Sequence, residues 1–361
     1  MKNEKTTNSP YTPDMIWEEF KVTPDALLGA KILESSVYLT RKCNLKCQYC
    51  KIIKTELPLE LTMEQWIEVM DILEGLGVRF VNIAGGEPTV LKGLGRLISH
   101  INNNTTLAHS IVSNSLFNDE KLKEMVDAGL KAYVASIDVM DGADKRLHDI
   151  RKSSAGMRML ERLKGKVPYL CGNIVISARN LSSVVEVTRY LSDNGIWVNV
   201  CPVIWGRGDK WESVEEADNA YRLTNEHRER LEDIAKRLVE LKRNGALLLP
   251  TESYLEGLPT YGPDLSWKCY SETEPTSPSR LIVDADGSLM TCINMRGEVA
   301  KRYTVFDLGN EDTYRGFVED WWEDAKRCQG CYWSTMVTAK QRQLMFEEFK
   351  KEVLKGNGTQ G

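Results

Sequence analysis

The sequence predicts an α/β protein whose parallel strands form a barrel or a partial barrel. From about residue 35 to residue 205, short runs rich in β-branched and aromatic residues alternate with longer runs of helical periodicity, which is typical of repeated β-α units. The predicted strands are apolar enough to be buried on both faces. Their right-handed succession predicts a barrel with its chemistry at the carboxyl ends of the strands.

Six strand-helix units can be placed along the chain. The first strand, at residues 35–40, leads directly into a cysteine-rich loop. Thr62 and Gln65 form a capping box at the start of the first helix, which ends at the Gly75-Leu76-Gly77 stop. The other strands are predicted at residues 79–83, 108–113, 132–138, 173–177 and 197–203, and the other helices at 91–103, 119–128, 156–164 and 182–194.

The rest of the chain has a different composition. A charged amphipathic helix is predicted at residues 216–244, and turns, aromatic residues and short strands follow it. A final helix at residues 338–354 is expected to pack over this region. We therefore divide the chain into an N-terminal extension (1–34), a barrel (35–250) and a small α+β region (251–361).

Composition excludes several classes of protein. The chain has 361 residues, of which 42% are hydrophobic, enough for a substantial core. No apolar run is long enough to span a bilayer and no secretory signal is present, so we expect a cytoplasmic protein without membrane contact. A net charge of −5 argues against a nucleic-acid partner. Nine cysteines in such a chain argue for metal binding and against disulfides.

Three cysteines are grouped directly after the first predicted strand. Cys43, Cys47 and Cys50 can each bind one iron of a [4Fe-4S] cluster, which leaves the fourth iron open to a substrate or cofactor. A Cys-x-x-Cys pair alone would also suit zinc or thiol redox chemistry. Zinc requires a fourth ligand, and none of the four histidines lies at a sequence-local zinc spacing from the triad.

Further motifs follow the next three predicted strands. Glycines in the run Gly85-Gly86-Glu87-Pro88 allow the backbone to approach a ligand closely. Ser113 and Asn114 follow the third strand. Ser136 ends the fourth strand, and Arg151, farther on, has a guanidinium that can bind a carboxylate through two bonds. Each motif alone is typical of a turn or a strand-end cap, but together they mark the edge where a shared ligand site would lie.

The triad spacing, with an aromatic residue before the last cysteine, resembles the signature of the radical S-adenosylmethionine (SAM) superfamily. The resemblance implies a partial (β/α)6 barrel in which the open iron chelates SAM. Reductive cleavage of SAM then gives a 5′-deoxyadenosyl radical that abstracts hydrogen from the substrate. Ser115 stands where the family has glycine in the turn near the ribose. The SAM contacts that the resemblance implies are Tyr49, Gly85, Gly86, Glu87, Ser113, Asn114, Ser136 and Arg151.

A second set of cysteines lies in the C-terminal region, at Cys269, Cys292, Cys328 and Cys331. With Gly287 as a hairpin signal before Cys292, the pattern resembles the auxiliary-cluster extension of radical SAM enzymes in its short form, the twitch domain. The longer form, the SPASM domain, has further cysteines after the Cys-x-x-Cys pair, and none follows Cys331. The resemblance implies one auxiliary [4Fe-4S] cluster with every iron bound by protein. Such a cluster would transfer electrons or only brace the region. A structural zinc is the alternative occupant.

Substrate and donor contacts can be suggested in two places. The candidates for a substrate pocket follow the sixth predicted strand and are Cys201, Trp205, Arg207 and Trp211. Packing and surface charge explain them equally well. Lys42, Lys46, Lys51 and Lys54 lie around the triad and could attract an acidic electron donor of the flavodoxin or ferredoxin type, although a solvated loop explains them as well.

From the sequence we expect hydrogen abstraction from a small polar metabolite, such as a sugar, cyclitol or nucleoside, followed by oxidation, elimination or epimerisation. Two features favour this prediction over modification of a ribosomally made peptide. Only about thirty residues precede the first strand, too few for a separate peptide-recognition domain, and the longer two-cluster extension is absent. Peptide modification is the alternative, and an iron-sulfur electron carrier or scaffold is the alternative of another class.

Overall fold

The computed structural model describes residues 30–47, 49, 50, 52, 59–140, 150–204, 220–270, 273, 277–293, 295–341 and 343. Among these residues, no helix is both long and apolar enough to cross a bilayer.

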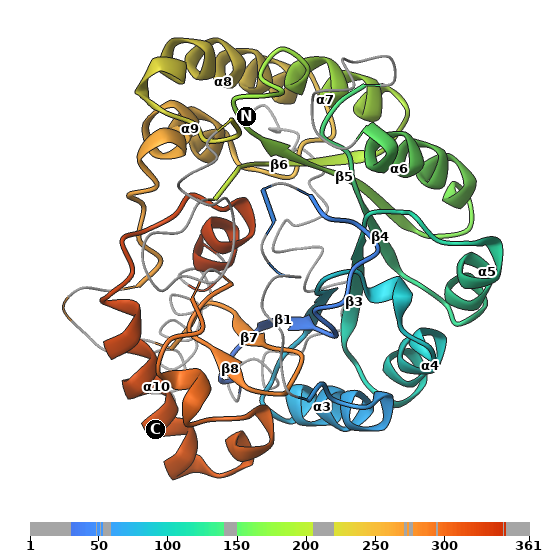
Figure 1. Cartoon of the computed structure of the whole chain (residues 1–361), viewed down its shortest axis with the longest axis vertical. Helices are drawn as coiled ribbons and strands as arrows, with labels where there is room; N and C mark the ends of the chain where they lie inside the picture. Colours follow the sequence, from blue (N-terminus) through green and yellow to red (C-terminus); the bar gives the residue numbers. More distant parts are fainter. Residues whose placement is uncertain are drawn as a thin grey trace, which may run out of the picture.

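One sheet organises the described part of the chain (Figure 1). Its strands are β1 (Glu34–Tyr38), β2 (Phe80–Ala84), β3 (Ala108–Ser113), β4 (Ala132–Ser136), β5 (Tyr169–Ile176), β6 (Trp197–Pro202), β7 (Leu281–Val283) and β8 (Leu289–Met290). Their order across the sheet is β6-β5-β4-β3-β2-β1-β7-β8. The first six strands are all parallel and curve around a common interior, so the predicted partial barrel is confirmed.

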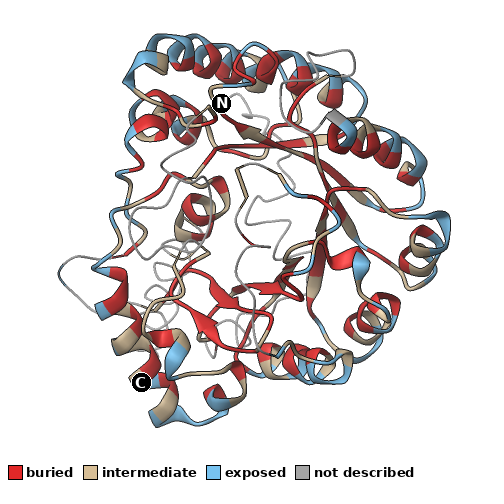
Figure 2. Ribbon diagram, viewed as in Figure 1, coloured by how far each residue is buried: buried red, intermediate tan, exposed pale blue. Residues whose placement is uncertain are grey.

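Helices surround the curved sheet on its outer side. They are α3 (Met63–Gly75), α4 (Leu94–Asn104), α5 (Asp119–Asp127), α6 (Ile150–Leu163), α7 (Val184–Asp193) and α8 (Arg228–Arg243), and α9 (Glu252–Asp264) packs against α8. Their inner faces are buried and their outer faces exposed (Figure 2). In α3, the apolar residues Trp66, Val69 and Met70 recur at helical spacing and are buried. The predicted capping box of Thr62 and Gln65 is present, with both bonds formed.

The C-terminal region continues the barrel sheet. β7 pairs with β1 in parallel, with Ser35 opposite Leu281, and β8 returns antiparallel to β7. Gly287 makes the connecting turn at a φ of 82°, a left-handed conformation that favours glycine, so the predicted hairpin is confirmed. The other helical segments are α10 (Glu311–Ala325), a helical stretch at residues 334–341, and the 3-10 turns η2 (Pro88–Val90), η3 (Asn225–His227), η4 (Val299–Lys301) and η5 (Val305–Gly309).

Two barrel elements begin earlier than predicted. β5 starts at Tyr169 and not at residue 173, because residues from Tyr169 onward pair with β4 although Gly172 weakens the strand pattern. α6 starts at Ile150 and not at residue 156. The hydroxyl of Ser153, in its first turn, accepts hydrogen bonds from the backbone N–H groups of Asp138 and Val139 at 3.0 and 3.3 Å. This start therefore depends on contacts with the end of β4.

Several C-terminal elements also differ from the prediction. α8 begins at Arg228, after a 3-10 turn, and part of its predicted span lies outside the described residues. α9 was not predicted, because Pro259 and Pro263 inside it weaken the helical pattern. α10 was also missed, in a segment expected to hold turns and short strands. The final helical stretch begins at residue 334 instead of 338, and most of the predicted helix lies outside the described residues.

Asp284 connects the C-terminal hairpin to the loop that follows β1. Its buried carboxylate forms ion pairs with the buried guanidinium of Arg41 and with Arg296. The Arg41 Nε–H also donates to Oδ1 of Asp284 at 3.2 Å. A second buried pair, between Arg280 and Glu34, joins the segment before β7 to β1. Charges removed from water in this way require their partners, because an unpaired buried charge is strongly destabilising.

We therefore expect Asp284→Asn to lower the free energy of unfolding by about 3 kcal/mol, because it leaves Arg41 without its counter-charge in the interior. Urea denaturation followed by circular dichroism measures this loss. Asp286→Asn is the matched control, since Asp286 also pairs with Arg296 but its side chain is 24% exposed, against 0% for Asp284. The control should cost less than about 1 kcal/mol, and equal losses would show that burial of the Asp284 pair does not matter.

Candidate active site

The loop after β1 carries the first cysteine set, and two hydrogen bonds to Glu60 fix its start. The Glu60 carboxylate accepts hydrogen bonds from the Thr40 hydroxyl at 2.8 Å and from the Arg41 N–H at 2.9 Å. The three cysteines that follow are partly exposed. The loop therefore presents its thiols at the carboxyl end of β1, as predicted.

The three thiols lie close enough together to influence one another. Burial raises the pKa of the Cys47 thiol to about 11; the ammonium of Lys152 acts in the opposite direction, and Cys50 and Cys43 raise the pKa further. Burial also raises the pKa of Cys43, and the Leu45 N–H, which donates to its sulfur at 3.4 Å, opposes this rise. Thiols with raised pKa values are protonated near neutral pH, and they release their protons when a metal binds them. Three neighbouring thiols on one loop suit a cluster with one open iron.

The glycines after β2 allow close contact with the cysteine loop. The N–H of Gly86 donates to the Thr40 carbonyl at 2.6 Å, and the N–H of Glu87 donates to the Lys42 carbonyl at 2.9 Å. A Cβ at Gly86 would lie 2.2 Å from the Lys42 oxygen, and one at Gly85 would lie 2.5 Å from the Thr40 oxygen. Glycine is thus required here for packing of one loop on another. The predicted role of Gly85 and Gly86 in binding SAM stays a prediction.

Glu87 joins the β2 loop to the end of β3. Its Oε1 accepts hydrogen bonds from the N–H and hydroxyl of Thr89 and from the Ser113 hydroxyl, and its Oε2 accepts from the Asn114 N–H at 2.7 Å. Burial raises the pKa of Glu87, and these hydrogen bonds act against that rise. Both carboxylate oxygens are therefore already bonded within the protein, and Glu87 fixes the positions of Ser113 and Asn114.

The turn after β3 reaches the first cysteine. The side-chain amide of Asn114 donates to Asn44 Oδ1 at 2.7 Å and lies 3.7 Å from the Cys43 sulfur. Ser115, where the family has glycine, has a φ of 65° and so keeps the left-handed backbone. Its hydroxyl forms a 2.8 Å hydrogen bond with the Tyr133 hydroxyl, which compensates for the cost of this conformation.

Three polar side chains near Cys47, those of Tyr49, Asp138 and Lys152, form one hydrogen-bonded group in which Asp138 and Lys152 are buried. The Lys152 ammonium donates to Asp138 Oδ2 and to the Tyr49 hydroxyl, both at 2.6 Å, and the Tyr49 hydroxyl donates to the same carboxylate oxygen at 3.0 Å. Burial alone would lower the pKa of Lys152, but the Asp138 carboxylate outweighs it and the pKa is raised. Tyr49, predicted to lie against adenine, is placed here with its hydroxyl toward Asp138. Lys152 was not among the predicted site residues.

The other predicted SAM contacts lie at the same end of the barrel. Ser136 is the last residue of β4 and is half-buried, and Arg151 is exposed in the first turn of α6. Cys201 is buried on β6, where burial raises its pKa to about 12, and Trp333 of the C-terminal region lies near its sulfur. Trp205, Arg207 and Trp211 lie outside the described residues.

The lysines around the triad are only partly described. Lys42 is exposed and lies 3.5 Å from Glu60, and Lys46 is exposed as well. Lys51 and Lys54 lie outside the described residues.

The second cysteine set lines one small cavity, which includes Cys269, Cys292, Cys328 and Cys331. Gly330, with a φ of 110°, turns the Cys-x-x-Cys segment onto residues 265–267, and the Cys331 N–H donates to the Trp267 carbonyl at 2.8 Å.

The surroundings of this cavity are apolar, with Trp267, Trp321 and Met336 in its wall. Burial raises the pKa of Cys269 to about 12, and the neighbouring Cys292 and Cys328 raise it further. Four thiols around a shared cavity fit a fully ligated [4Fe-4S] cluster.

The buried pair of Lys152 and Asp138 gives a direct test. Lys152→Met should lower the free energy of unfolding by about 3 to 5 kcal/mol, because Asp138 would keep a charge in the interior without its cation. Adding Asp138→Asn to this variant should recover part of the loss, because it removes the unpaired charge. Thermal and urea unfolding measure both effects.

Lys164→Met is the matched control, since Lys164 pairs with Glu161 on the surface of α6. It should cost less than about 1 kcal/mol. If the double variant were less stable than Lys152→Met, the buried charge would not be the cause of the loss.

The chain is similar in sequence and in fold to several known proteins. The chain is 30% identical over 210 residues to the PqqA peptide cyclase of Bradyrhizobium diazoefficiens, covering 54% of each protein, so it spans about half of that relative. It is 25% identical over 277 residues to the GTP 3′,8-cyclase of Alkaliphilus metalliredigens, covering 73% of this chain and 81% of that one. The solved structure of anSMEcpe with AdoMet and the Cp18Cys peptide superposes with a TM-score of 0.56 at 16% identity, covering 91% and 99% of the two chains.

A protein-family model that matches the barrel region shows to which family the chain belongs. The model of the radical SAM superfamily matches residues 37–220, more than half of the chain. This range begins in β1 and includes the cysteine triad and the motifs at the ends of β2, β3 and β4. The chain belongs to the radical SAM superfamily and is a radical SAM enzyme that binds a [4Fe-4S] cluster and SAM.

Proposed function

We propose that this enzyme modifies a peptide by hydrogen abstraction and oxidation. The observation that carries the proposal is the second thiol set, four cysteines that line one small cavity. The relatives support the choice of substrate, since one is named a peptide cyclase, and a solved structure with this fold along nearly all of the chain holds a peptide. This reverses the preference for a small polar metabolite that the sequence suggested.

The first thiol set would serve SAM cleavage, and the second would serve the later oxidation of the peptide. Cys43, Cys47 and Cys50 would hold the cluster that supplies the electron for SAM cleavage, giving methionine and the 5′-deoxyadenosyl radical. That radical takes one hydrogen atom from the peptide. Loss of a proton and one further electron from the peptide radical then leaves a product two hydrogen atoms lighter.

The electron would leave through one auxiliary cluster at the second site. Because Cys269, Cys292, Cys328 and Cys331 would together bind all four irons of such a cluster, no iron would be left for the substrate, and the cluster would supply electron transfer. Lys42 and Lys46, exposed on the first loop, would favour docking of an acidic donor of the flavodoxin or ferredoxin type.

A nucleotide substrate is the second candidate. The observation in its favour is the match to a GTP 3′,8-cyclase over 73% of this chain, which extends beyond the barrel. The two candidates predict different effects of an added peptide and of added GTP on 5′-deoxyadenosine formation.

The first test uses anaerobically reconstituted enzyme with SAM and dithionite. Changing Cys43, Cys47 and Cys50 together to Ala should abolish 5′-deoxyadenosine formation, measured by liquid chromatography and mass spectrometry, while about four irons remain at the second site as an internal check of folding. Persistent 5′-deoxyadenosine formation would contradict the role of the triad.

The reciprocal variant tests the second site. Changing Cys328 and Cys331 to Ser should remove about four irons but leave some SAM cleavage, because the triad is intact. Iron content by absorbance and zinc content by atomic emission distinguish the two metals. Unchanged iron together with lost zinc would assign the site to zinc.

The substrate class is tested by what stimulates 5′-deoxyadenosine formation. A peptide encoded next to the gene should stimulate it and become two hydrogen atoms lighter, and GTP should not stimulate it. Stimulation by GTP and by no such peptide would reverse the proposal.

A further inference from the structure

We propose that Lys152 raises the reduction potential of the cluster held by the cysteine triad, because it keeps one positive charge buried beside that cluster. The step concerned is the transfer of one electron from an external donor of the flavodoxin or ferredoxin type to the oxidised cluster. No bond forms or breaks in this step, and the charge of the cluster becomes more negative by one. The inference rests on the assignment of the triad to this cluster and is independent of the substrate.

Lys152 has a fixed position in the interior. Its side chain is 5% exposed, and its ammonium donates at 2.6 Å to the Tyr49 hydroxyl and to Oδ2 of Asp138. The Asp138 side chain is fully buried, and its other carboxylate oxygen accepts the Val175 N–H at 3.0 Å. The ammonium is therefore fixed between the cysteine loop and the segment that follows β4.

The bond to Tyr49 brings this charge to the cysteine loop. Tyr49 directly precedes Cys50, and the N–H of Cys50 donates to the Cys47 carbonyl at 3.0 Å. The ammonium is thus bonded to a side chain of the turn that carries two of the three thiols. Burial lowers the pKa of Lys152, whereas Asp138 and, after it, Cys47 and Cys50 raise it. The charge of Lys152 therefore acts on both of these cysteines.

At the cysteines, the lysine charge outweighs that of its partner. Burial has the largest effect on the pKa of Cys47 and raises it; Lys152 has the next largest effect and lowers it, and Asp138 raises it by less. A cluster bound at this position would experience a net positive potential from the pair. A positive potential stabilises the reduced cluster, which carries the added electron.

Burial makes this charge more effective than the other lysines of the loop. Lys42 and Lys46 are exposed, and salt screens exposed charges over about 8 Å at physiological ionic strength. With an effective dielectric constant of about 20 in place of about 80, a Coulomb interaction is about four times stronger. Net charge and exposure to solvent are among the factors that set the potential of an iron-sulfur cluster.

Stability alone does not account for the buried pair. Replacement of a buried ion pair by apolar residues of similar volume is often neutral or stabilising. Lys152 and Asp138 are therefore not needed merely to fill this space. An effect of the lysine charge on the neighbouring cluster gives the pair a function.

The test is a redox titration of the anaerobically reconstituted holoenzyme, followed by electron paramagnetic resonance with and without SAM. The signal that changes when SAM is added belongs to the cluster with the open iron, and its midpoint potential is compared between variants. Lys152→Met should lower the equilibrium constant for one-electron reduction at least roughly tenfold, which lowers the midpoint potential by about 59 mV. Asp138→Asn should raise the potential, because the lysine charge then acts without its partner.

Opposite shifts distinguish an effect of charge from a structural effect. Looser packing would admit water to the cluster in both variants and would shift both potentials in the same direction. If Lys152→Met is too unstable to hold the cluster, its combination with Asp138→Asn removes the unpaired buried charge. The potential of this double variant should still lie below that of the parent enzyme, because the lysine charge acts more strongly on the cysteines.

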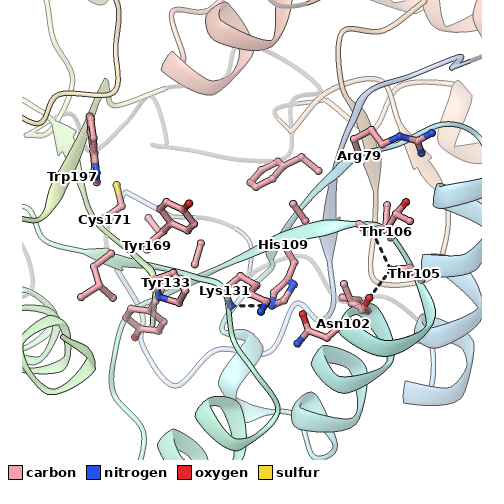
Figure 3. A pocket seen from close by; sticks show the side chains of 18 of the residues that line it. Arg79, Asn102, Thr105, Thr106, His109, Lys131, Tyr133, Tyr169, Cys171 and Trp197 are labelled. Carbon is pink, nitrogen blue, oxygen red and sulfur yellow. Dashed lines mark hydrogen bonds between the residues drawn. The ribbon is translucent and has the colours of Figure 1, made fainter. Parts of the chain in front are cut away.

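Lys131→Met is the control for a change in overall charge. Lys131 is exposed and lies one residue before β4, at the end opposite to Asp138, where it lines a cavity of about 700 Å³ (Figure 3). The strand separates Lys131 from Ser136 by roughly 16 Å, at about 3.3 Å for each residue. This distance is about two Debye lengths at physiological ionic strength. The control should leave the midpoint potential unchanged.

The proposal is overturned if Lys152→Met or the double variant keeps the potential of the parent enzyme. It is also overturned if Lys152→Met and Asp138→Asn shift the potential in the same direction, or if Lys131→Met lowers it as much as Lys152→Met. A wrong assignment of the triad would have a different result, namely a SAM-sensitive signal that persists when all three cysteines of the triad are changed to Ala.

Discussion

The buried pair of Arg41 and Asp284 is the contact on which the arrangement of both thiol sets depends. Arg41 lies two residues before Cys43, and Asp284 lies in the hairpin that leads to Cys292. The same short segment also receives Glu60 and the backbone of Gly86 and Glu87. The first cysteine loop is therefore held by three separate parts of the chain, and a change in one of them would move the thiols relative to the strand ends.

Much of the fold and part of the site could be predicted from the sequence, because the signals are local. The spacing of the triad, the glycines after β2 and the capping box of α3 are all contained within a few residues. Lys152 was missed because nothing near it in the sequence marks it as buried; its partners Tyr49 and Asp138 come from other elements. The early start of α6 was missed for the same reason, because Ser153 bonds to Asp138 and Val139, which are distant from it in the sequence.

The glycine motif illustrates what a family resemblance leaves out. Gly85 and Gly86 were predicted to allow a ligand to approach, and the structure places protein oxygens in that space. Ser115 departs from the family residue and yet keeps the backbone conformation that glycine would adopt. The substrate preference had a weaker basis, because it relied on the short segment before β1 and on cysteines that do not follow Cys331. The relatives favour the opposite choice.

The pairing of β7 with β1 has a consequence for electron flow. A hinge cannot open between two strands that share backbone hydrogen bonds unless those bonds break, and Ser35 and Val37 are in register with Leu281 and Val283. In the proposed reaction, electron transfer depends steeply on the distance between the first cysteine loop and the second thiol set. The paired strands β1 and β7 fix the points from which the first cysteine loop and the hairpin before Cys292 extend, and so limit how far that distance can change.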